Sequence, residues 1–388
     1  MIKKILLAVL APLCLSMNLF AAEPAPVFDM HSDILLRAID NDATLGDPPA
    51  WTQVSIPTMR EGHVANQVLS VWVNSYGVTG CAATRRALQM IDEFERQAAE
   101  YSDDIALAQS VAEAEDIRNS GRVAMWLWLE GGAPIDDDLA ILRTFHRLGV
   151  RGMTLTWNNN LLWAGASMEK DAPGKGLTDF GREVVAVMNR LGMVIDISHV
   201  SDETFFDALA ASSDPVVASH SSCRTLCDHP RNLSDEQLRA LAKNGGVIGI
   251  NALPSYLDDE WDRAWEETEA RIADQIEALK EKYDGNTRDP LYREARRVAI
   301  QNALPEENKV TIDDYLDHIE HAIEIAGWEH VGLGSDFDGI WAFPVGLEKA
   351  SKWQAVAKGL RARGHSEEVV RGVMHENVER VFRQVIDQ

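Results

Sequence analysis

A short apolar run followed by an amphipathic stretch recurs eight times along the chain, and this repeat limits the fold more than any other feature of the sequence. Most of the runs are continuously apolar, as is typical of parallel strands covered on both faces. They span residues 27–33, 67–73, 123–130, 152–157, 193–199, 215–220, 246–251 and 330–336. Eight strand-then-helix units predict a (β/α)₈ TIM barrel. A doubly wound open sheet is the alternative, but no glycine-rich phosphate turn follows the first run.

Capping residues mark where the helices between these runs begin. Thr178 is positioned to cap one helix, and Ser234 with Gln237 three residues later forms a capping box for another. Thr311 opens a third helix in the same way. These signals support a regular alternation of strands and helices.

One segment interrupts the alternation. Residues 253–310, between the seventh and eighth predicted strands, are charged and mostly helical in pattern. Long insertions in a barrel commonly form lids or substrate walls, and a dimerisation arm is an equal alternative. We therefore predict a long helical insertion between strands 7 and 8, and we expect the protein to be a homodimer.

The start of the chain has the three parts of a secretory signal: two lysines, an apolar run over 5–13, and small residues at 21–22. A transmembrane anchor is the alternative, but Pro12 interrupts the run well short of the roughly 20 apolar residues that a span requires. We therefore predict a signal peptide at 1–22 and export to the periplasm or the medium. The mature chain, 23–388, is expected to be one barrel domain without a membrane span.

The charge of the chain limits its partners. It carries 61 acidic against 37 basic residues, which gives a formal net charge of −24. Nucleic-acid binding needs clustered Lys and Arg to neutralise phosphates, and anionic membranes need the same. We therefore expect no nucleic-acid partner, and a small molecule as the substrate.

Polar residues stand where five of the predicted strands stop: His31 and Asp33, Glu130, His199, His220, and Asp336. The active site of a TIM barrel lies at the carboxyl ends of its strands, and residues i and i+2 of a strand point to the same side. We therefore expect these side chains to meet at one rim, where imidazoles and carboxylates suit a metal such as Zn²⁺. Two other histidines, His318 and His321, share a charged helix face, and we expect both to be solvated.

The number of ligands indicates two metals. The candidate ligands are His31, Asp33, Glu130, His199 and His220, which is more than a three-ligand hydrolytic zinc site uses. Two ions about 3.5–4 Å apart need a bridging anion. The predicted strand 152–157 contains no lysine that could be carbamylated for this purpose. Two zinc ions per chain, bridged by Glu130 and a water or hydroxide, are therefore expected.

Six motifs occur in a characteristic order: Met30-His31-Ser32-Asp33, Leu129-Glu130-Gly131-Gly132, Asp196-Ile197-Ser198-His199, Ala218-Ser219-His220-Ser221-Ser222, Pro230-Arg231-Asn232 and Gly334-Ser335-Asp336-Phe337-Asp338-Gly339. From about residue 27 to the C-terminus the chain resembles the membrane (renal-type) dipeptidase family, peptidase family M19, of the amidohydrolase superfamily. The resemblance implies that His31 and Asp33 bind one zinc, that His199 and His220 bind the other, and that Glu130 bridges them.

The same resemblance implies roles for two further residues. Arg231 matches the residue that holds the substrate carboxylate, and Asp336 matches the catalytic acid and base. Taken without the resemblance, Arg231 in its Pro-Arg-Asn context is equally consistent with a structural loop residue. A guanidinium is nevertheless well suited to a two-pronged contact with a carboxylate.

One position departs from the family pattern. Trp157 stands where the better-known members carry a histidine that contacts the substrate near the scissile carbonyl. An indole can neither accept a proton nor ligate a metal. Either Asn158 or Asn160 takes over that contact, or the chain handles a different amide. We therefore count Trp157 and Asn160 as candidate substrate-binding residues.

These observations together predict a zinc-dependent dipeptidase that hydrolyses dipeptides with a free C-terminal carboxylate, with D-residues at the second position among the candidates. A related barrel metallohydrolase acting on N-acyl amino acids, lactones or other amides is the alternative, and Trp157 favours it. A non-catalytic zinc-binding protein would need neither Asp336 nor Arg231, so their joint presence argues against that class.

Overall fold

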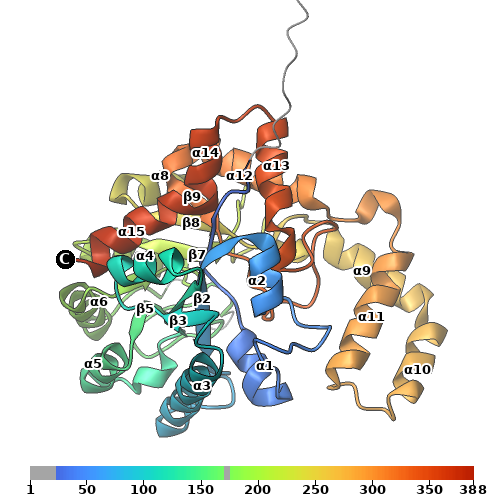
Figure 1. Cartoon of the computed structure of the whole chain (residues 1–388), viewed down its shortest axis with the longest axis horizontal. Helices are drawn as coiled ribbons and strands as arrows, with labels where there is room; N and C mark the ends of the chain where they lie inside the picture. Colours follow the sequence, from blue (N-terminus) through green and yellow to red (C-terminus); the bar gives the residue numbers. More distant parts are fainter. Residues whose placement is uncertain (1–22, 170–174) are drawn as a thin grey trace, which may run out of the picture.

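Eight parallel strands close into a barrel in the computed structural model, which describes residues 23–169 and 175–388 (Figure 1). Each barrel strand pairs with the next in chain order, including β2 with β4 from Asn66↔Ala124 to Trp72↔Glu130, and the ring closes where β9 pairs with β1 at Leu333↔Asp29. The barrel strands are β1 (Val27–Asp29), β2 (Val64–Trp72), β4 (Val123–Glu130), β5 (Val150–Thr154), β6 (Val194–Asp196), β7 (Val217–Ser221), β8 (Val247–Ile250) and β9 (Val331–Leu333). The predicted (β/α)₈ TIM barrel is confirmed.

A further strand, β3 (Ile105–Leu107), is missing from the sequence-based prediction. It pairs with the first residues of β4, from Ile105↔Val123 to Leu107↔Met125. Three residues are too few to form an apolar run that stands out from its surroundings. Because β3 lies at the start of β4, it does not reach the end of the barrel where the polar residues gather.

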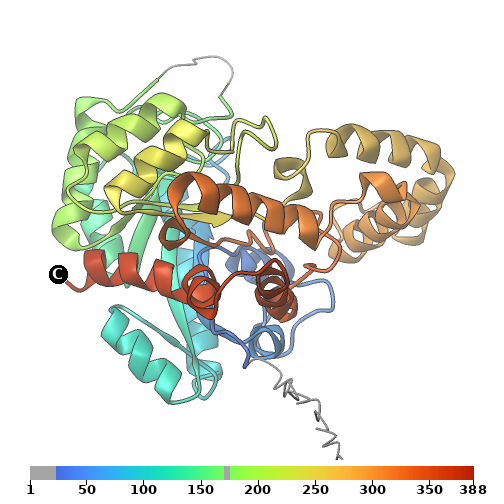
Figure 2. The ribbon, with the colours of Figure 1, turned by 90° about the horizontal axis from the view of Figure 1, so that it is seen from above.

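Helices surround the barrel, as Figure 2 shows from above. Those that follow the barrel strands are α1 (Ile34–Asn41), α2 (Ile56–Gly62), α3 (Cys81–Glu100), α4 (Val111–Asn119), α5 (Leu139–Arg147), α6 (Asp179–Leu191), α7 (Asp202–Ala211), α8 (Asp235–Asn244), α12 (Ile312–Ala326), α13 (Trp353–Ala362), α14 (Glu367–Arg371) and α15 (Asn377–Ile386). Short 3₁₀ or π segments are η1 (Ala133–Ile135), η2 (Pro254–Tyr256), η3 (Glu306–Asn308), η4 (Trp328–His330), η5 (Ala350–Lys352) and η6 (Gly372–Glu376).

The predicted helix starts are confirmed. The Thr178 side chain accepts a backbone N–H bond at the start of α6. Ser234 and Gln237 form the capping box of α8, and Thr311 forms one with Asp314 at α12. These caps satisfy backbone donors that the first helical turn leaves without partners.

Alternation along β4 decides which of its side chains enter the barrel. Ala124, Trp126 and Trp128 point inward and form one cluster with Phe382 of α15, which packs against both tryptophans with ring centroids 5.1 and 5.7 Å apart. Glu130 continues this alternation by one more step. The amino-terminal half of the barrel is thereby filled with large apolar side chains, so Glu130 stands at the upper limit of the apolar core.

Three helices make up the insertion between β8 and β9: α9 (Trp261–Arg271), α10 (Ala273–Lys282) and α11 (Pro290–Ala303). They extend away from the barrel on one side (Figure 2). Trp261 and Trp265 of α9 attach this arm to the barrel by packing on Trp341, with ring centroids 5.1 Å apart in each case. The predicted helical insertion over 253–310 is confirmed.

Four predicted strands extend three or more residues too far in the carboxyl direction. β1 ends at Asp29 rather than at 33, β5 at Thr154 rather than at 157, β6 at Asp196 rather than at 199, and β9 at Leu333 rather than at 336. Polar side chains at these ends make local contacts with the backbone and with each other, and Asp336 adopts a left-handed backbone with φ 59° that cannot continue a strand. His31, Asp33, His199 and Asp336 therefore lie on the loops just beyond the strands, whereas Glu130 and His220 lie within β4 and β7.

One prediction made from the helical pattern is wrong. His318 on α12 is buried, with 1% of its surface exposed. It accepts a hydrogen bond from the backbone N–H of Cys223 at 3.1 Å and donates to the carbonyl oxygen of Leu257 at 3.1 Å. His318 thus joins the loop after β7 to the base of the insertion.

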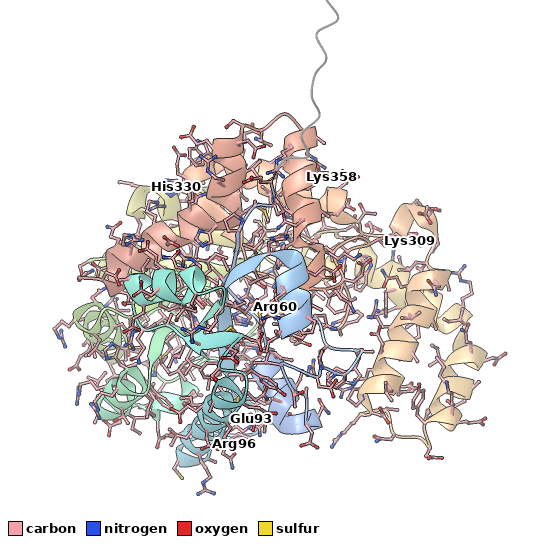
Figure 3. All side chains as sticks on the ribbon, viewed as in Figure 1. Arg60, Glu93, Arg96, Lys309, His330 and Lys358 are labelled. Carbon is pink, nitrogen blue, oxygen red and sulfur yellow. The ribbon has the colours of Figure 1, made fainter. Side chains whose placement is uncertain are left out.

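Two further points concern the predicted signal segment and membrane contact. The predicted signal peptide, 1–22, lies outside the described residues. Across residues 23–169 and 175–388, no helix combines the length and the apolar character that crossing a bilayer requires. Charged side chains such as Arg60 and Arg96, labelled in Figure 3, are exposed over 58% and 65% of their area.

Candidate metal centre

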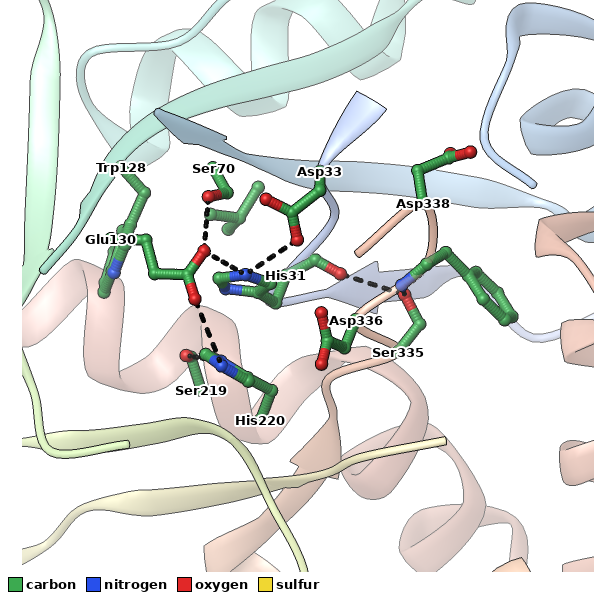
Figure 4. A network of polar contacts seen from close by, with 12 residues as sticks. His31, Asp33, Ser70, Trp128, Glu130, Ser219, His220, Ser335, Asp336 and Asp338 are labelled. Atoms are coloured by element: carbon green, nitrogen blue, oxygen red, sulfur yellow. Dashed lines mark hydrogen bonds and ion pairs between the residues drawn. The ribbon is translucent and has the colours of Figure 1, made fainter. Parts of the chain in front are cut away.

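The five predicted ligands meet at the carboxyl end of the barrel, and all of them are buried; Figure 4 labels His31, Asp33, Glu130 and His220. Their exposed fractions are 0% for His31, 4% for Asp33, 4% for Glu130, 6% for His199 and 0% for His220. They come from the ends of β1, β4, β6 and β7, far apart in sequence. Buried ionisable groups are stable only when they are paired or bind a metal.

Glu130 is the centre of the cluster. Its Oε2 lies 3.2 Å from Nε2 of His31, and its Oε1 lies 3.2 Å from Nε2 of His199 and 3.8 Å from Nε2 of His220. Ser70 on β2 donates a hydrogen bond to Oε2 at 2.7 Å. Burial alone would raise the pKa of Glu130, but the charge of His31 and the hydrogen bond with His199 outweigh it and hold the pKa below its usual range.

His31 collects negative charge at one nitrogen. Its Nε2 lies 3.5 Å from Oδ2 of Asp33 and 3.2 Å from Oε2 of Glu130. Burial lowers the pKa of His31, but the two carboxylates raise it well above its ordinary value. This nitrogen therefore faces a position that favours a positive charge, which a metal ion supplies in place of a proton.

His199 and His220 direct their Nε2 atoms at each other, 2.8 Å apart. Nδ1 of His199 donates to Oδ1 of Asn158 at 2.8 Å, and Nδ1 of His220 donates to Oγ of Ser219 at 2.7 Å. Ser219 in turn donates to Oδ2 of Asp196 at 2.6 Å. With the protons held at Nδ1, both Nε2 atoms present lone pairs to a shared space, as metal-binding imidazoles do.

The pKa values of these two histidines agree with neutral rings. Burial, together with the charge of Arg231, lowers the pKa of His199 to about 4. Burial and the charge of His31 lower the pKa of His220 well below its ordinary value. Neutral imidazole is the form that binds a metal, so the donor set fits a metal centre.

Asp33 and Asp336 approach each other beside Gly339. A Cβ atom at Gly339 would lie 2.2 Å from Oδ2 of Asp33 and 2.3 Å from Oδ1 of Asp336, so only glycine leaves room for both carboxylates. Asn251, at the end of β8, donates to Oδ2 of Asp336 at 3.0 Å. Burial, opposed by the charge of His31, raises the pKa of Asp336 to about 8.

Two residues of the site have left-handed backbone conformations. His199 has φ 68° and Asp336 has φ 59°, in a region that non-glycine residues occupy at a cost of about 1–3 kcal/mol each. Such conformations persist where the surrounding contacts fix them, and they are concentrated at functional sites. The neighbouring Asp338, also left-handed, turns its carboxylate away from His31 (Figure 4) and accepts the backbone N–H groups of Gln53 and Val54.

Arg231 lies in the buried loop after β7, with 2% of its surface exposed. Its Nη2 donates to the carbonyl oxygen of His220 at 3.0 Å, and its Cζ lies 5.5 Å from the ring centroid of Tyr256. Nε of Arg231 is buried and has no hydrogen-bond partner among the described residues. A buried guanidinium that lacks a carboxylate partner has the capacity to bind an anion.

Trp157 and Asn160, the two candidate substrate-binding residues in the loop after β5, have different surroundings. Trp157 packs on Trp72 and Tyr76, with ring centroids 5.0 and 5.4 Å apart, and its own ring lies 6.5 Å from that of His199. The side-chain oxygen of Asn160 accepts the backbone N–H of Ala166 at 2.8 Å. Trp157 therefore stands at the rim of the centre, whereas the Asn160 side chain joins two parts of its own loop.

The sequence motifs assign no role to several residues that complete the site. They are Ser70, Asp196, Ser219 and Asn251, and each contacts a predicted ligand or Asp336 directly or through one side chain. Ser70 lies in β2, next to the strand β4 that carries Glu130. Asn251 directly follows β8, next to the strand β9 that leads to Asp336. A polar residue at the end of an apolar run was a usable signal for Asn251, but partners across strands depend on the register.

Residues 20–388 match the model of the family described as membrane dipeptidase (peptidase family M19). A dipeptidase of Schizosaccharomyces pombe, itself uncharacterised, is 34% identical over 379 residues, which cover 93% of this chain and 80% of that protein.

Solved structures resemble the fold over nearly the whole chain. The dipeptidase AC, a metallopeptidase of family M19, is 26% identical with a TM-score of 0.77, covering 94% of this chain and 100% of its own. A metallopeptidase from Rhodobacter sphaeroides, solved with a phosphinate mimic of the dipeptide L-Ala-D-Ala, is 24% identical with a TM-score of 0.75 and the same coverage. The probable dipeptidase PvdM from Pseudomonas aeruginosa is 24% identical with a TM-score of 0.76, covering 94% and 96%.

Proposed function

The chain belongs to the membrane dipeptidase family, peptidase family M19, and is a metallo-dipeptidase; from this premise we propose that it uses two zinc ions to hydrolyse dipeptides with a free C-terminal carboxylate. The observation that carries the proposal is the position of Glu130, with His31 at one carboxylate oxygen and His199 at the other, each at 3.2 Å. One carboxylate between two groups of ligands is the arrangement that a pair of metal ions requires.

The donor types fit zinc, because imidazole nitrogens and carboxylate oxygens are among its preferred ligands. In this proposal His31 and Asp33 hold one ion, His199 and His220 hold the other, and Glu130 contacts both. When bound, the metal supplies positive charge that lowers the pKa of water and polarises the substrate carbonyl. Asn158 and Ser219 support the site by keeping the protons of the two histidines at Nδ1.

Asp336 is the proposed proton carrier. Its carboxylate lies in one group of metal-binding type with His31 and Asp33, and Asn251 orients one of its oxygens at 3.0 Å. In this role the carboxylate accepts a proton from the attacking water and passes it to the amine nitrogen as the C–N bond breaks. Water is consumed, and the two amino acids are the products.

Arg231 is the proposed binding residue for the substrate carboxylate. Its charge influences both His199 and His220, so the guanidinium lies near the metal ligands, and its buried Nε lacks a partner among the described residues. A carboxylate held here stands one residue from the cleaved bond, which favours dipeptides over longer peptides. The L-Ala-D-Ala mimic bound by the Rhodobacter sphaeroides protein supports D-residues at the second position as substrates of this chain too.

A second candidate function follows from one specific observation. The aromatic side chains of Trp72, Tyr76 and Trp157 form a wall beside His199, where an acyl group could pack as well as an amino-acid side chain. Hydrolysis of N-acyl amino acids is therefore the alternative. It keeps the same metals, the same Asp336 and the same carboxylate contact with Arg231.

Metal analysis tests the two-ion assignment. The purified protein should hold about two zinc ions per chain at saturation, and Glu130→Gln should lose both the stoichiometry and most of the activity. A wild-type stoichiometry of one metal per chain would contradict the bridging role of Glu130. The matched control is Glu95→Gln on the outer helix α3, which should bind two.

A substrate panel distinguishes the candidate functions. Turnover is measured with L-L and L-D dipeptides, the corresponding dipeptide amides, and an N-acyl amino acid. Arg231→Ala should raise KM for dipeptides roughly 10–100-fold because a charge-assisted contact is lost. The control is Arg239→Ala, which removes an exposed arginine of α8 whose partner is Asp235 on the same helix. An equal rise in KM for dipeptides and for dipeptide amides would contradict the carboxylate contact.

Asp336→Asn tests the proton carrier. The amide keeps the shape and the contact distance but cannot accept the proton, so kcat should fall roughly 10²–10⁴-fold while the metal content stays unchanged. Near-normal turnover with full metal content would show that another group moves the proton.

Two other expectations, export after cleavage at 1–22 and a homodimer, stay predictions for N-terminal sequencing and solution mass measurement.

A further inference from the structure

A second cavity, of about 460 Å³, lies between the inserted arm and the barrel. Its walls come from α1, from the loop around residues 51–53, from α11 and from the loop at 340–343. Figures 1 and 2 show α11 standing off from the barrel on the side where α1 lies. None of the five predicted metal ligands lines this cavity, so it is separate from the metal centre.

Four arginines line the cavity, and two of them are neutralised by local partners. Arg296 is ion-paired with Glu269, with its Nε 2.7 Å from Oε1. Arg297 is ion-paired with Glu294 on the same helix at 2.6 Å. These two arginines are held by the arm itself and leave no free charge.

The other two arginines form no ion pair among the described residues, although the charge of Arg37 acts on the buried carboxylate of Asp338 and opposes the rise in its pKa. Arg37 on α1 donates from Nε to the carbonyl oxygen of Asp338 at 2.7 Å, and Arg293 on α11 donates from Nε to the carbonyl oxygen of Thr287 at 3.4 Å. Among the described residues, their terminal nitrogens carry no hydrogen bond to a side chain. Both guanidinium groups line the same cavity, Arg37 from α1 and Arg293 from α11.

These two charges act on each other. Burial lowers the pKa of Arg293, and the charges of Arg37 and Arg288 lower it further. Arg293 is exposed and Arg37 is half-buried, so water solvates both charges, and an anion that binds between them would relieve their mutual repulsion. The two positive charges therefore indicate that the cavity binds an anion.

The remaining walls are largely aromatic. Trp51 and Trp341 line the cavity together with Tyr292 and Phe343, and Ile340 adds an aliphatic surface. Flat aromatic faces bind apolar or aromatic groups and also stabilise cations beside them. A ligand that fits both features carries a negative charge on a flat or apolar body.

We propose that this cavity is a second binding site, for a small carboxylate anion with an aromatic or apolar body, which Arg37 and Arg293 clamp from opposite walls. A planar carboxylate matches the fork of a guanidinium, and two such forks give the site its selectivity for anions. The site goes beyond dipeptide hydrolysis and does not rest on it.

The cavity shares a loop with the metal centre. Ile340 lines the cavity, and its backbone N–H donates to the carbonyl oxygen of Asp336 at 3.0 Å. Arg37 stands one helical turn after Asp33. The carboxylate that binds in the cavity could therefore come from two sources. One is the acidic end of an extended substrate that starts at the metal centre, and the other is a free anion that binds alone.

The test uses the metal-loaded protein and 4-bromobenzoate as the probe. Isothermal titration should detect binding to the wild type, and Arg37→Gln and Arg293→Gln should each weaken it about tenfold or more because each removes a charge-assisted contact. Arg288→Gln is the matched control, since it removes a nearby positive charge that does not line the cavity, and it should change the affinity less than about threefold. In a crystal, the anomalous signal of bromine should lie in this cavity.

Arg293→Gln keeps the proposal falsifiable if Arg37→Gln loosens the loop at Asp338, because Arg293 makes only one weak backbone contact. Unchanged affinity in Arg293→Gln, or bromine found only at the metal centre, would overturn the proposal. Because binding is measured without turnover, loss of dipeptidase activity and failure of this site are distinguishable. Competitive inhibition of dipeptide hydrolysis by the probe would assign the anion to an extended substrate, and non-competitive inhibition to a free anion.

Discussion

Asn158 accepts a hydrogen bond at Oδ1 from Nδ1 of the candidate ligand His199, at a distance of 2.8 Å. This contact fixes the tautomer of His199 and turns Nε2 toward Glu130 and His220. Trp157, the departure from the family pattern, is the preceding residue and packs on two other aromatic rings. The segment that carries the departure therefore also orients one side of the metal centre.

We expect Asn158→Ala to weaken metal binding about 10–100-fold, since contacts that orient a ligand typically have effects of that size. The measurement is zinc retention against a chelator series, together with turnover at saturating zinc. Asn160→Ala is the matched control, because its side chain contacts the backbone of Ala166 instead of a ligand. If the two variants retained zinc equally well, the orienting role of Asn158 would be wrong.

Ser219→Ala tests the corresponding contact of the second histidine. The serine links Nδ1 of His220 to the buried carboxylate of Asp196, and its loss should lower zinc affinity about tenfold. Zinc titration with a competing dye measures the change. Ser167→Ala is the control, because the buried hydroxyl of Ser167 has no hydrogen-bond partner among the described residues, and it should bind zinc as the wild type does.

Gly339→Ala should abolish most activity without unfolding the chain. The added Cβ would stand 2.2 Å from the Asp33 carboxylate and 2.3 Å from that of Asp336, and a displacement of about 1 Å at a reacting group costs about 100-fold in rate. Kinetics and thermal unfolding are measured together. Gly77→Ala, where nothing lies within 4 Å of an added Cβ, should match the wild type in both. Full activity in Gly339→Ala would mean that the two carboxylates need not approach so closely.

Acid should destabilise the protein partly through His318. Burial lowers its pKa to about 4 from an ordinary value of 6.5, so the unfolded chain binds the proton first as the pH falls. The stabilisation is complete above pH 6.5 and is lost as the pH falls toward 4, with an upper limit of about 3 kcal/mol in the free energy of unfolding. Denaturant unfolding between pH 7 and pH 4 measures it.

His318→Gln should lower stability at pH 7 and flatten this pH dependence. His63→Asn is the control, because His63 is exposed and asparagine tolerates its left-handed backbone. An unchanged slope in His318→Gln would mean that the acid sensitivity originates in other groups.

The alternation of apolar runs and amphipathic stretches predicts most of the barrel, because the barrel is built from strands and helices that these short patterns specify. The run 123–129 is apolar without interruption, since parallel strands covered on both sides bury every side chain. The strand β3 is not predicted, because its three residues are too few to show an apolar run. The helical periodicity around His318 predicts a solvated face, since sequence alone does not reveal that the loop after β7 and the base of the insertion cover it.

The order of residues along the chain determined the strand-helix repeat, the caps of the helices and the positions at which apolar runs end in His, Asp or Glu. The register of the barrel and the path of its loops decided the rest. Only they bring Ser70 to Glu130 and Asn251 to Asp336, and only they set Arg37 across a cavity from Arg293. Such contacts join residues many positions apart, so their distances depend on how the whole sheet closes, and no local spacing in the sequence encodes them.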